Sequence, residues 1–171
     1  SRYGNFHFID WVAAWKNDFG VPPGDGEFNA VLNAQWILVL KKYIELEQIF
    51  GEPQRAQQAQ SEVRIASGAL MQVFWDDARN LLADDPARVH FSEHAQCLTI
   101  LADLLPADQA DRLMEQMGRA DQLARVSFYF AHYYFEACVR TGRMDLFFRK
   151  LEMWPTLLQK GFLTVPETPD P

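Results

Sequence analysis

The feature that most restricts the fold of this chain is a succession of apolar stripes at helical spacing. Between residues 26 and 160, apolar side chains recur every three or four positions, and Gly, Pro and Asp residues separate one stripe from the next. No segment alternates apolar and polar residues between turn signals, as a half-buried strand would. We therefore expect an all-α protein built from antiparallel helical hairpins.

Six helices are predicted from these stripes and from residues that favour helix ends. Asp25 and Ser92 are candidate N-caps, because their side-chain oxygens can accept hydrogen bonds from the free amides of a first helical turn. Gly51 and the Thr141-Gly142 pair are typical of helix C-termini. The helices are expected at about 25–50, 53–82, 92–105, 106–118, 121–141 and 143–160, the last one interrupted by Pro155.

The periodicity does not decide how the hairpins are arranged, because bundles, solenoids and α/α toroids all contain antiparallel helix pairs. One segment favours a toroid. Residues 126–135, in the predicted fifth helix, are apolar or aromatic on nearly every side, which indicates a helix buried on most faces. This pattern suits the inner helix of a two-layer ring and equally the central helix of a large bundle.

The chain has 171 residues, which is enough to bury a core, and we expect a single domain over 1–171. Residues 1–25 are predicted to be irregular, because glycines and the Pro22-Pro23 pair interrupt any helix. This segment is rich in Phe and Trp, which is typical of a packed functional segment rather than a linker. Residues 26–160 are expected to form the hairpins, and 161–171 an extended segment.

Composition excludes several classes of protein. The net charge is -7 and the basic residues are scattered, which argues against nucleic-acid binding. The longest apolar run, Trp36 to Leu40, is far too short to span a bilayer, and the N-terminal residues lack the pattern of a signal peptide. Cys97 and Cys138 lie in helical apolar patterns and are expected to be buried free thiols.

Several His and Ser residues are candidate reactive groups. His90 and His94 are four residues apart, but the sequence around them does not match HExxH, so no metal site is predicted. Ser127 with His132, and Ser92 with His94, lack the G-x-S-x-G context of a nucleophile, and a capping Ser and a packed His are the favoured interpretations. No Gly-rich phosphate loop is present, and no cofactor is predicted.

Two carboxylates differ from the rest. Most Asp and Glu residues lie on polar helix faces, whereas Asp10 and Glu167 are embedded in apolar, non-helical sequence. A carboxyl group in such surroundings needs hydrogen-bond partners or has a shifted pKa, and both properties are typical of functional sites. Together with the abundant aromatic residues, they would suit glycoside cleavage, in which aromatic faces stack on the sugar and two carboxyls flank the scissile bond.

Four segments resemble the bacterial α-L-rhamnosidases of glycoside hydrolase family 78, and they follow the order of that family. Trp154 to Glu167 is similar to its Trp-…-Gly-x-Thr-Thr-x-x-Glu stretch and is the most specific of the four. Phe8-Ile9-Asp10-Trp11 is similar to its Phe/Gly-Asp-Trp segment. Ser92 to Gln96 resembles a Ser-x-x-x-Gln helix start, and Ala137 to Asp145 resembles the segment before the last helix.

The resemblance implies part of an (α/α)6 toroid, the six-hairpin glycosidase fold, and inverting hydrolysis of terminal α-L-rhamnosides without a cofactor. It implies that Glu167 is the general base, and that Asp10 and Trp11 belong to the sugar-binding subsite. Leu163 and Pro166 depart from the family's pattern, where Thr and often Trp stand. These departures concern the shape of the subsite more than the role of Glu167.

The family's general acid lies in an Arg-Asp-Glu-Arg type motif that has no match in this chain, and its His shortly after the base would lie beyond Pro171. We therefore expect the chain to be the C-terminal part of a catalytic domain, with the rest of that domain as its partner, and to be inactive in isolation. Two alternatives remain open: another (α/α)6 sugar hydrolase or lyase, and a non-catalytic helical interaction module.

Overall fold

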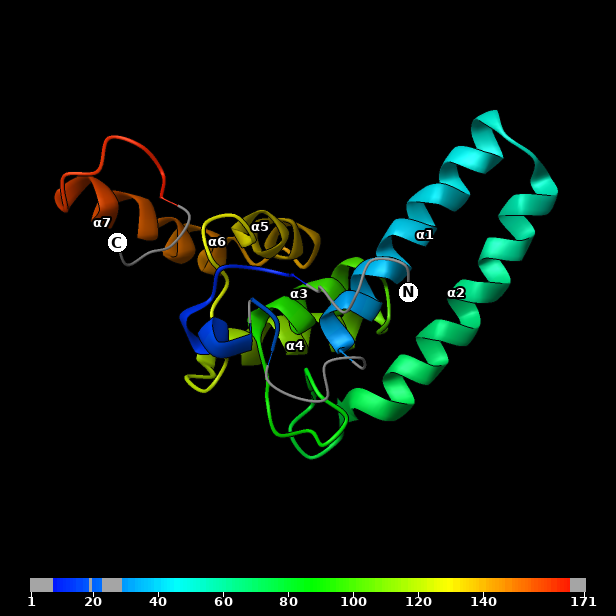
Figure 1. The fold of residues 1–171 in the computed structure, drawn as a ribbon, viewed down its shortest axis with the longest axis horizontal. Coiled ribbons are helices and arrows are strands. Elements are labelled where there is room, and N and C mark those ends of the chain that lie inside the picture. Colours follow the sequence, from blue (N-terminus) through cyan, green and yellow to red (C-terminus); the bar gives the residue numbers. More distant parts are fainter. Residues whose placement is uncertain (1–7, 19, 23–28, 167–171) are drawn as a thin grey trace.

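The computed structural model describes residues 8–18, 20–22 and 29–166. Over these ranges it is mostly helical, with packed helix pairs, as predicted (Figure 1). The elements in chain order are the 3-10 helix η1 (Ala13–Asp18), then α1 (Ala30–Phe50), α2 (Pro53–Phe74), β1 (Trp75–Asp76), β2 (Leu81–Leu82), α3 (Glu93–Leu101), α4 (Ala107–Arg119), α5 (Ala131–Arg140), α6 (Met144–Leu151) and α7 (Met153–Gln159).

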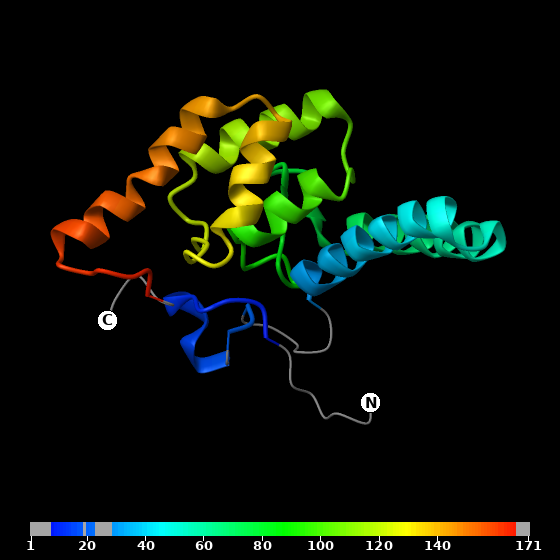
Figure 2. The ribbon, with the colours of Figure 1, turned by 90° about the horizontal axis from the view of Figure 1, so that it is seen from above.

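The helices form a long hairpin and a more compact body. Helices α1 and α2 pack along each other and extend away from the other helices (Figures 1 and 2). The first turns of α1 rest on α3, and α3 also packs against α4 and α5. Helix α3 is therefore the element that joins the hairpin to the body.

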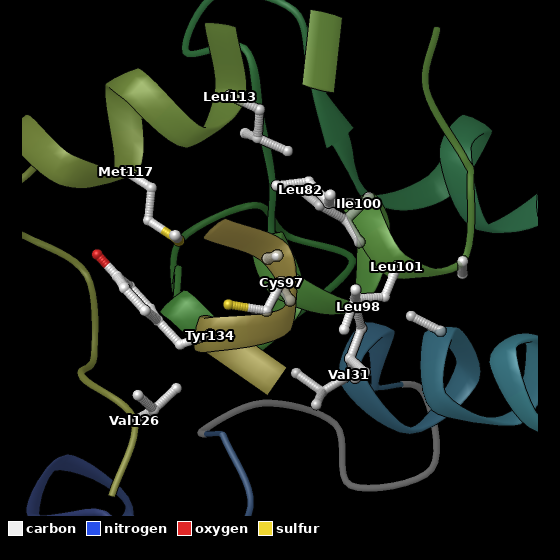
Figure 3. Packing of buried hydrophobic residues seen from close by; sticks show 14 of the residues in the cluster. Val31, Leu82, Cys97, Leu98, Ile100, Leu101, Leu113, Met117, Val126 and Tyr134 are labelled. Atoms are coloured by element: carbon white, nitrogen blue, oxygen red, sulfur yellow. The ribbon is translucent and has the colours of Figure 1, made fainter. Parts of the chain in front are cut away.

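Helix α3 is the most buried element, since all nine of its residues are buried. Figure 3 shows side chains of α1, α4 and α5 converging on its apolar residues. Two of its polar residues are satisfied inside the protein: the Gln96 side chain exchanges two hydrogen bonds with the backbone of Leu82 (2.8 and 2.9 Å), and Thr99 donates to the carbonyl of Ala95 (2.7 Å). The element buried on all faces is thus α3 and not the predicted fifth helix.

The predicted start of the first helix at Asp25 was wrong. Helix α1 begins at Ala30, because Asn29 has an extended backbone and its Oδ1 accepts hydrogen bonds from the amides of Val31 (2.8 Å) and Leu32 (3.2 Å). Asp25 itself lies outside the described residues.

The predicted second helix was too long, and the expectation of no strands was wrong in one place. Helix α2 ends at Phe74, and the two-residue strands β1 and β2 form an antiparallel hairpin with Trp75 opposite Leu82. In the connecting turn the Arg79 amide donates to Asp76 Oδ1 (3.0 Å), and Asn80 has a φ of 50°. Strands of two residues are too short to produce an alternating pattern.

Helix boundaries later in the chain were correct where local capping decides them. Ser92 caps α3, its Oγ accepting from the Ala95 amide (3.2 Å), and α5 ends before Thr141. Helix α3 stops at Leu101 rather than near Leu105. The predicted interruption by Pro155 separates α6 from α7, because a proline ring clashes with the carbonyl four residues earlier, here that of Leu151.

The fifth helix begins at Ala131 and not at Asp121. The preceding segment pairs with the start of α3 instead: the Ala124 amide donates to the Phe91 carbonyl (3.0 Å), and the Glu93 amide donates to the Ala124 carbonyl (2.9 Å). These tertiary hydrogen bonds use backbone groups that a helix would need. Cys97 and Cys138 are both buried and unbonded, as predicted.

Candidate functional site

The irregular segments before α1, α3 and α5 provide the candidate site. Residues 8–22, 83–92 and 120–130 each precede a helix that packs on the central core. The first segment closes on itself, since the amides of Ile9 and Asp10 both donate to the carbonyl of Gly20 (2.9 and 3.1 Å). Gly20 has a φ of 84°, and a Cβ there would lie 2.6 Å from the ring of Phe8, so glycine is needed at this turn.

Asp10 lies at the junction of these segments and is fully buried. His94 Nε2, on α3, lies 2.7 Å from Asp10 Oδ2. The amide of Ser127, in the segment before α5, donates to the same oxygen (2.9 Å), and the Ser127 hydroxyl donates to Oδ1. The amide of Trp11 also donates to Oδ1 (2.9 Å). One carboxylate therefore connects three segments that are distant in sequence.

His94 is held between two aromatic rings. Its imidazole centroid lies 4.4 Å from those of both Trp15 and Phe130, and it has no exposed surface. Its Nδ1 has no hydrogen-bond partner among the described residues. The arrangement fits a neutral imidazole in which Nε2 carries the proton and donates it to Asp10.

Electrostatics agree with this protonation pattern. Burial alone would raise the pKa of Asp10, but the hydrogen bonds from His94 and Ser127 together outweigh it and hold the pKa below its usual value. Burial lowers the pKa of His94, although the adjacent Asp10 opposes this shift. Asp10 is therefore ionised and His94 neutral near pH 7.

Trp11 is exposed to solvent, whereas the neighbouring Asp10 is buried. The Trp11 side chain is 48% exposed and packs edge-on against Phe8, with ring centroids 4.8 Å apart. Tyr129, two residues after Ser127, is also exposed. The buried network thus has exposed aromatic residues beside it on two of its segments, and aromatic rings of this kind can stack on a sugar.

Glu167, the predicted general base, lies outside the described residues. The chain leading to it turns at Gly161, whose φ is 86°, and then runs back from the end of α7 toward the rest of the protein (Figure 2). Helix α7 is attached to the body through Trp154, whose ring packs against Phe128 and Phe135, with centroids 5.3 and 5.7 Å apart.

Several carboxyls that the sequence did not single out are also buried (Asp76, Asp84, Asp85 and Glu93), and Asp84 differs from the others in having an unpaired oxygen among the described residues. Asp84 Oδ1 accepts a hydrogen bond from the Ser92 hydroxyl (2.6 Å), but its Oδ2 has no partner among the described residues. Burial raises the pKa of Asp84 to about 7, and Asp85 adds to the shift while Ser92 opposes it. No residue pattern indicated this, because Asp84-Asp85-Pro86 is typical of an exposed turn.

An open pocket of about 340 Å³ lies beside Asp84. The irregular segments and η1 form its walls, which include Trp15, Arg79, Asp84, His90, Phe91 and Gln122. Arg79 is paired with Asp76 (2.6 Å) and lies over the ring of Phe91, so its charge is already neutralised.

The His and Ser pairs considered from the sequence do not converge. His90 Nδ1 contacts Asp85 (3.2 Å), whereas His94 contacts Asp10, and His132 pairs with Glu136 (3.5 Å) rather than Ser127. Within the described ranges, no group of three His, Cys, Asp or Glu side chains could hold a metal ion. No described helix is both long and apolar enough to cross a membrane.

Comparison with known proteins supports the fold. No protein-family model and no curated protein matches the sequence. Among solved structures, the chain is similar to part of a rhamnosidase from Klebsiella oxytoca with rhamnose bound, with a TM-score of 0.74 and 20% identity. The likeness covers 90% of this chain and 28% of that chain. At this identity it shows the fold alone, that of a helical portion of a glycosidase.

Proposed function

We propose that this chain is the C-terminal part of an (α/α)6 catalytic domain that removes terminal α-L-rhamnose from glycosides by inverting hydrolysis. The observation that carries the proposal is the likeness in fold to part of a rhamnosidase, which extends over 90% of the chain. The order of the four sequence segments described above supports it independently.

In this proposal the residues at the junction have separate roles. Trp11 presents an indole face to the sugar, and the buried Asp10 contributes to the subsite by holding the Trp11 backbone. Glu167 acts as the general base that activates water. Inverting hydrolysis needs a second carboxyl about 6.5–9.5 Å away as the acid, and the rest of the catalytic domain supplies it.

An apolar seam on α1 supports the presence of further helices. Five of the six large apolar residues exposed on α1 recur at alternating spacings of three and four: Trp36, Val39, Tyr43, Leu46 and Phe50. This spacing places them on one face of the helix, and such faces normally pack against another helix. In the proposed enzyme, the seam packs against helices of the same toroid.

The seam also suits a non-catalytic interaction module, and the likeness in fold does not distinguish rhamnose from other sugars. The test is hydrolysis of an aryl α-L-rhamnoside by the full-length protein that contains this chain. We expect release of the aryl group and, by NMR, β-L-rhamnose as the first product. The 171-residue chain alone should release nothing. Hydrolysis of a different glycoside would favour another (α/α)6 enzyme, and no hydrolysis of any glycoside would favour the module.

A further inference from the structure

Residues 8–22, which include Trp11, pack on the core through Ile9 and Trp15, but their hydrogen bonds to the rest of the protein converge on one side chain. Among the described residues, every hydrogen bond between 8–22 and the remainder of the chain ends on the carboxylate of Asp10. The other hydrogen bonds of this segment, including those to Gly20, stay inside it. Over the described ranges, the donors from outside the segment are His94 and Ser127.

The same carboxylate fixes the backbone of Trp11. Asp10 Oδ1 accepts from the Trp11 amide (2.9 Å) while Oδ2 accepts from His94 Nε2 (2.7 Å). Loss of the His94 hydrogen bond therefore affects the Trp11 backbone through the Asp10 side chain. All three anchoring side chains are buried, so water cannot readily replace a lost donor.

We infer that His94 and Ser127 are positioning residues of the sugar-binding subsite: by holding Asp10, they keep the exposed indole of Trp11 in one orientation against the sugar. The inference rests on the proposed function through the role of Trp11. Both residues are buried, so they act by holding Asp10 and not by contacting the sugar or transferring a proton.

The experiment uses the full-length protein and separates packing from hydrogen bonding. His94→Phe keeps a ring between Trp15 and Phe130 but removes the donor to Asp10, whereas His94→Gln retains an N–H donor. Ser127→Ala removes the hydroxyl but leaves the backbone amide that donates to Asp10. His132→Phe is the matched control, since His132 is exposed and lies outside the network.

Each variant is made in the natural background and with Trp11→Ala, and kcat, KM and melting temperature are measured on an aryl α-L-rhamnoside. We expect His94→Phe to raise KM roughly 10-fold while kcat changes less. The stacking contact of Trp11 stabilises the bound substrate and the transition state equally, so its loss weakens binding more than turnover. Ser127→Ala should have a smaller effect, and His94→Gln should restore part of the loss. In the Trp11→Ala background, His94→Phe should raise KM no further, because the effects of substitutions at two coupled residues do not add.

A His94→Phe protein with a lower melting temperature and an unchanged KM would show a purely structural role and overturn the inference. An equal rise in KM in both backgrounds would also overturn it, because the effect would not pass through Trp11. If His94→Phe does not fold, Ser127→Ala is measured in both backgrounds instead, and the same outcomes support or overturn the inference. No effect of Trp11→Ala itself on KM would instead remove the proposed role of Trp11, on which the inference depends.

Discussion

Two buried carboxyl groups near the N-terminal end of α3 are satisfied in different ways. Asp10 accepts hydrogen bonds from three residues and has a lowered pKa, so it is ionised at neutral pH. Asp84 has only the Ser92 hydroxyl on one oxygen, and burial raises its pKa to about 7. The pair shows that the number of donors, and not burial alone, decides the charge of a buried carboxyl.

The raised pKa of Asp84 predicts a loss of stability as pH rises. In the unfolded chain the group releases its proton near its ordinary pKa of 3.8, whereas the folded protein retains it up to about 7. The folded state therefore binds more protons between these values, and its stability falls with increasing pH across that window, by on the order of 4 kcal/mol in total.

Urea unfolding at pH 5 and pH 8 measures this effect. In Asp84→Asn, the free energy of unfolding should fall less between pH 5 and pH 8. Asp77→Asn, at an exposed position in the nearby turn, should show the same fall as the unchanged protein. An unchanged slope in Asp84→Asn would show that Asp84 is already ionised at pH 5 in the folded protein.

The proposed role of Glu167 is tested by Glu167→Gln in the full-length protein. Gln keeps the shape of the side chain but cannot accept a proton from water, so kcat should fall roughly 10²–10⁴-fold while KM changes far less. Glu152→Gln is the control, since Glu152 is exposed at the end of α6. Near-normal turnover with a lower melting temperature would indicate that Glu167 only satisfies backbone donors.

At the scale of elements, local capping and tertiary pairing decide different boundaries. Ser92 caps α3 with its own side chain, and Pro155 separates α6 from α7, so both boundaries follow from neighbouring residues. The start of α5 is set by backbone hydrogen bonds between Ala124 and the residues around the start of α3. Boundaries of the first kind are predictable from sequence, and those of the second kind are not.

The cap of α1 provides a test at this scale. Asn29→Ala removes the acceptor for the amides of Val31 and Leu32, and it should lower the free energy of unfolding by about 1 kcal/mol. Asp25→Ala, at the cap expected from sequence, should have little effect. Denaturant unfolding of both variants measures the two effects. A larger loss of stability in Asp25→Ala would indicate that the helix begins at Asp25 and not after Asn29.

At the scale of the whole molecule, the exposed seam of α1 allows a test of the proposal that the chain packs against further helices of a larger domain. If the seam is covered in the full-length protein, Val39→Lys with Leu46→Lys should lower its melting temperature by several degrees, because buried charges are costly. The same changes should have little effect on the 171-residue chain, where both positions are exposed. Gln48→Lys, also exposed on α1, is the control, and equal losses in both proteins would argue against a covered seam.

The sequence by itself determined the helical class and most helices, because apolar spacing, caps and prolines act within a few residues of one another. It also indicated that Asp10 needs partners, from its apolar surroundings. Only the tertiary structure decided which partners these are, since His94 and Ser127 lie 84 and 117 positions away. The β1–β2 hairpin is local, but strands of two residues leave no pattern in the sequence. The tertiary structure also decided the irregular segment before α5, which pairs with backbone groups about thirty residues earlier, and the raised pKa of Asp84, which follows from its burial.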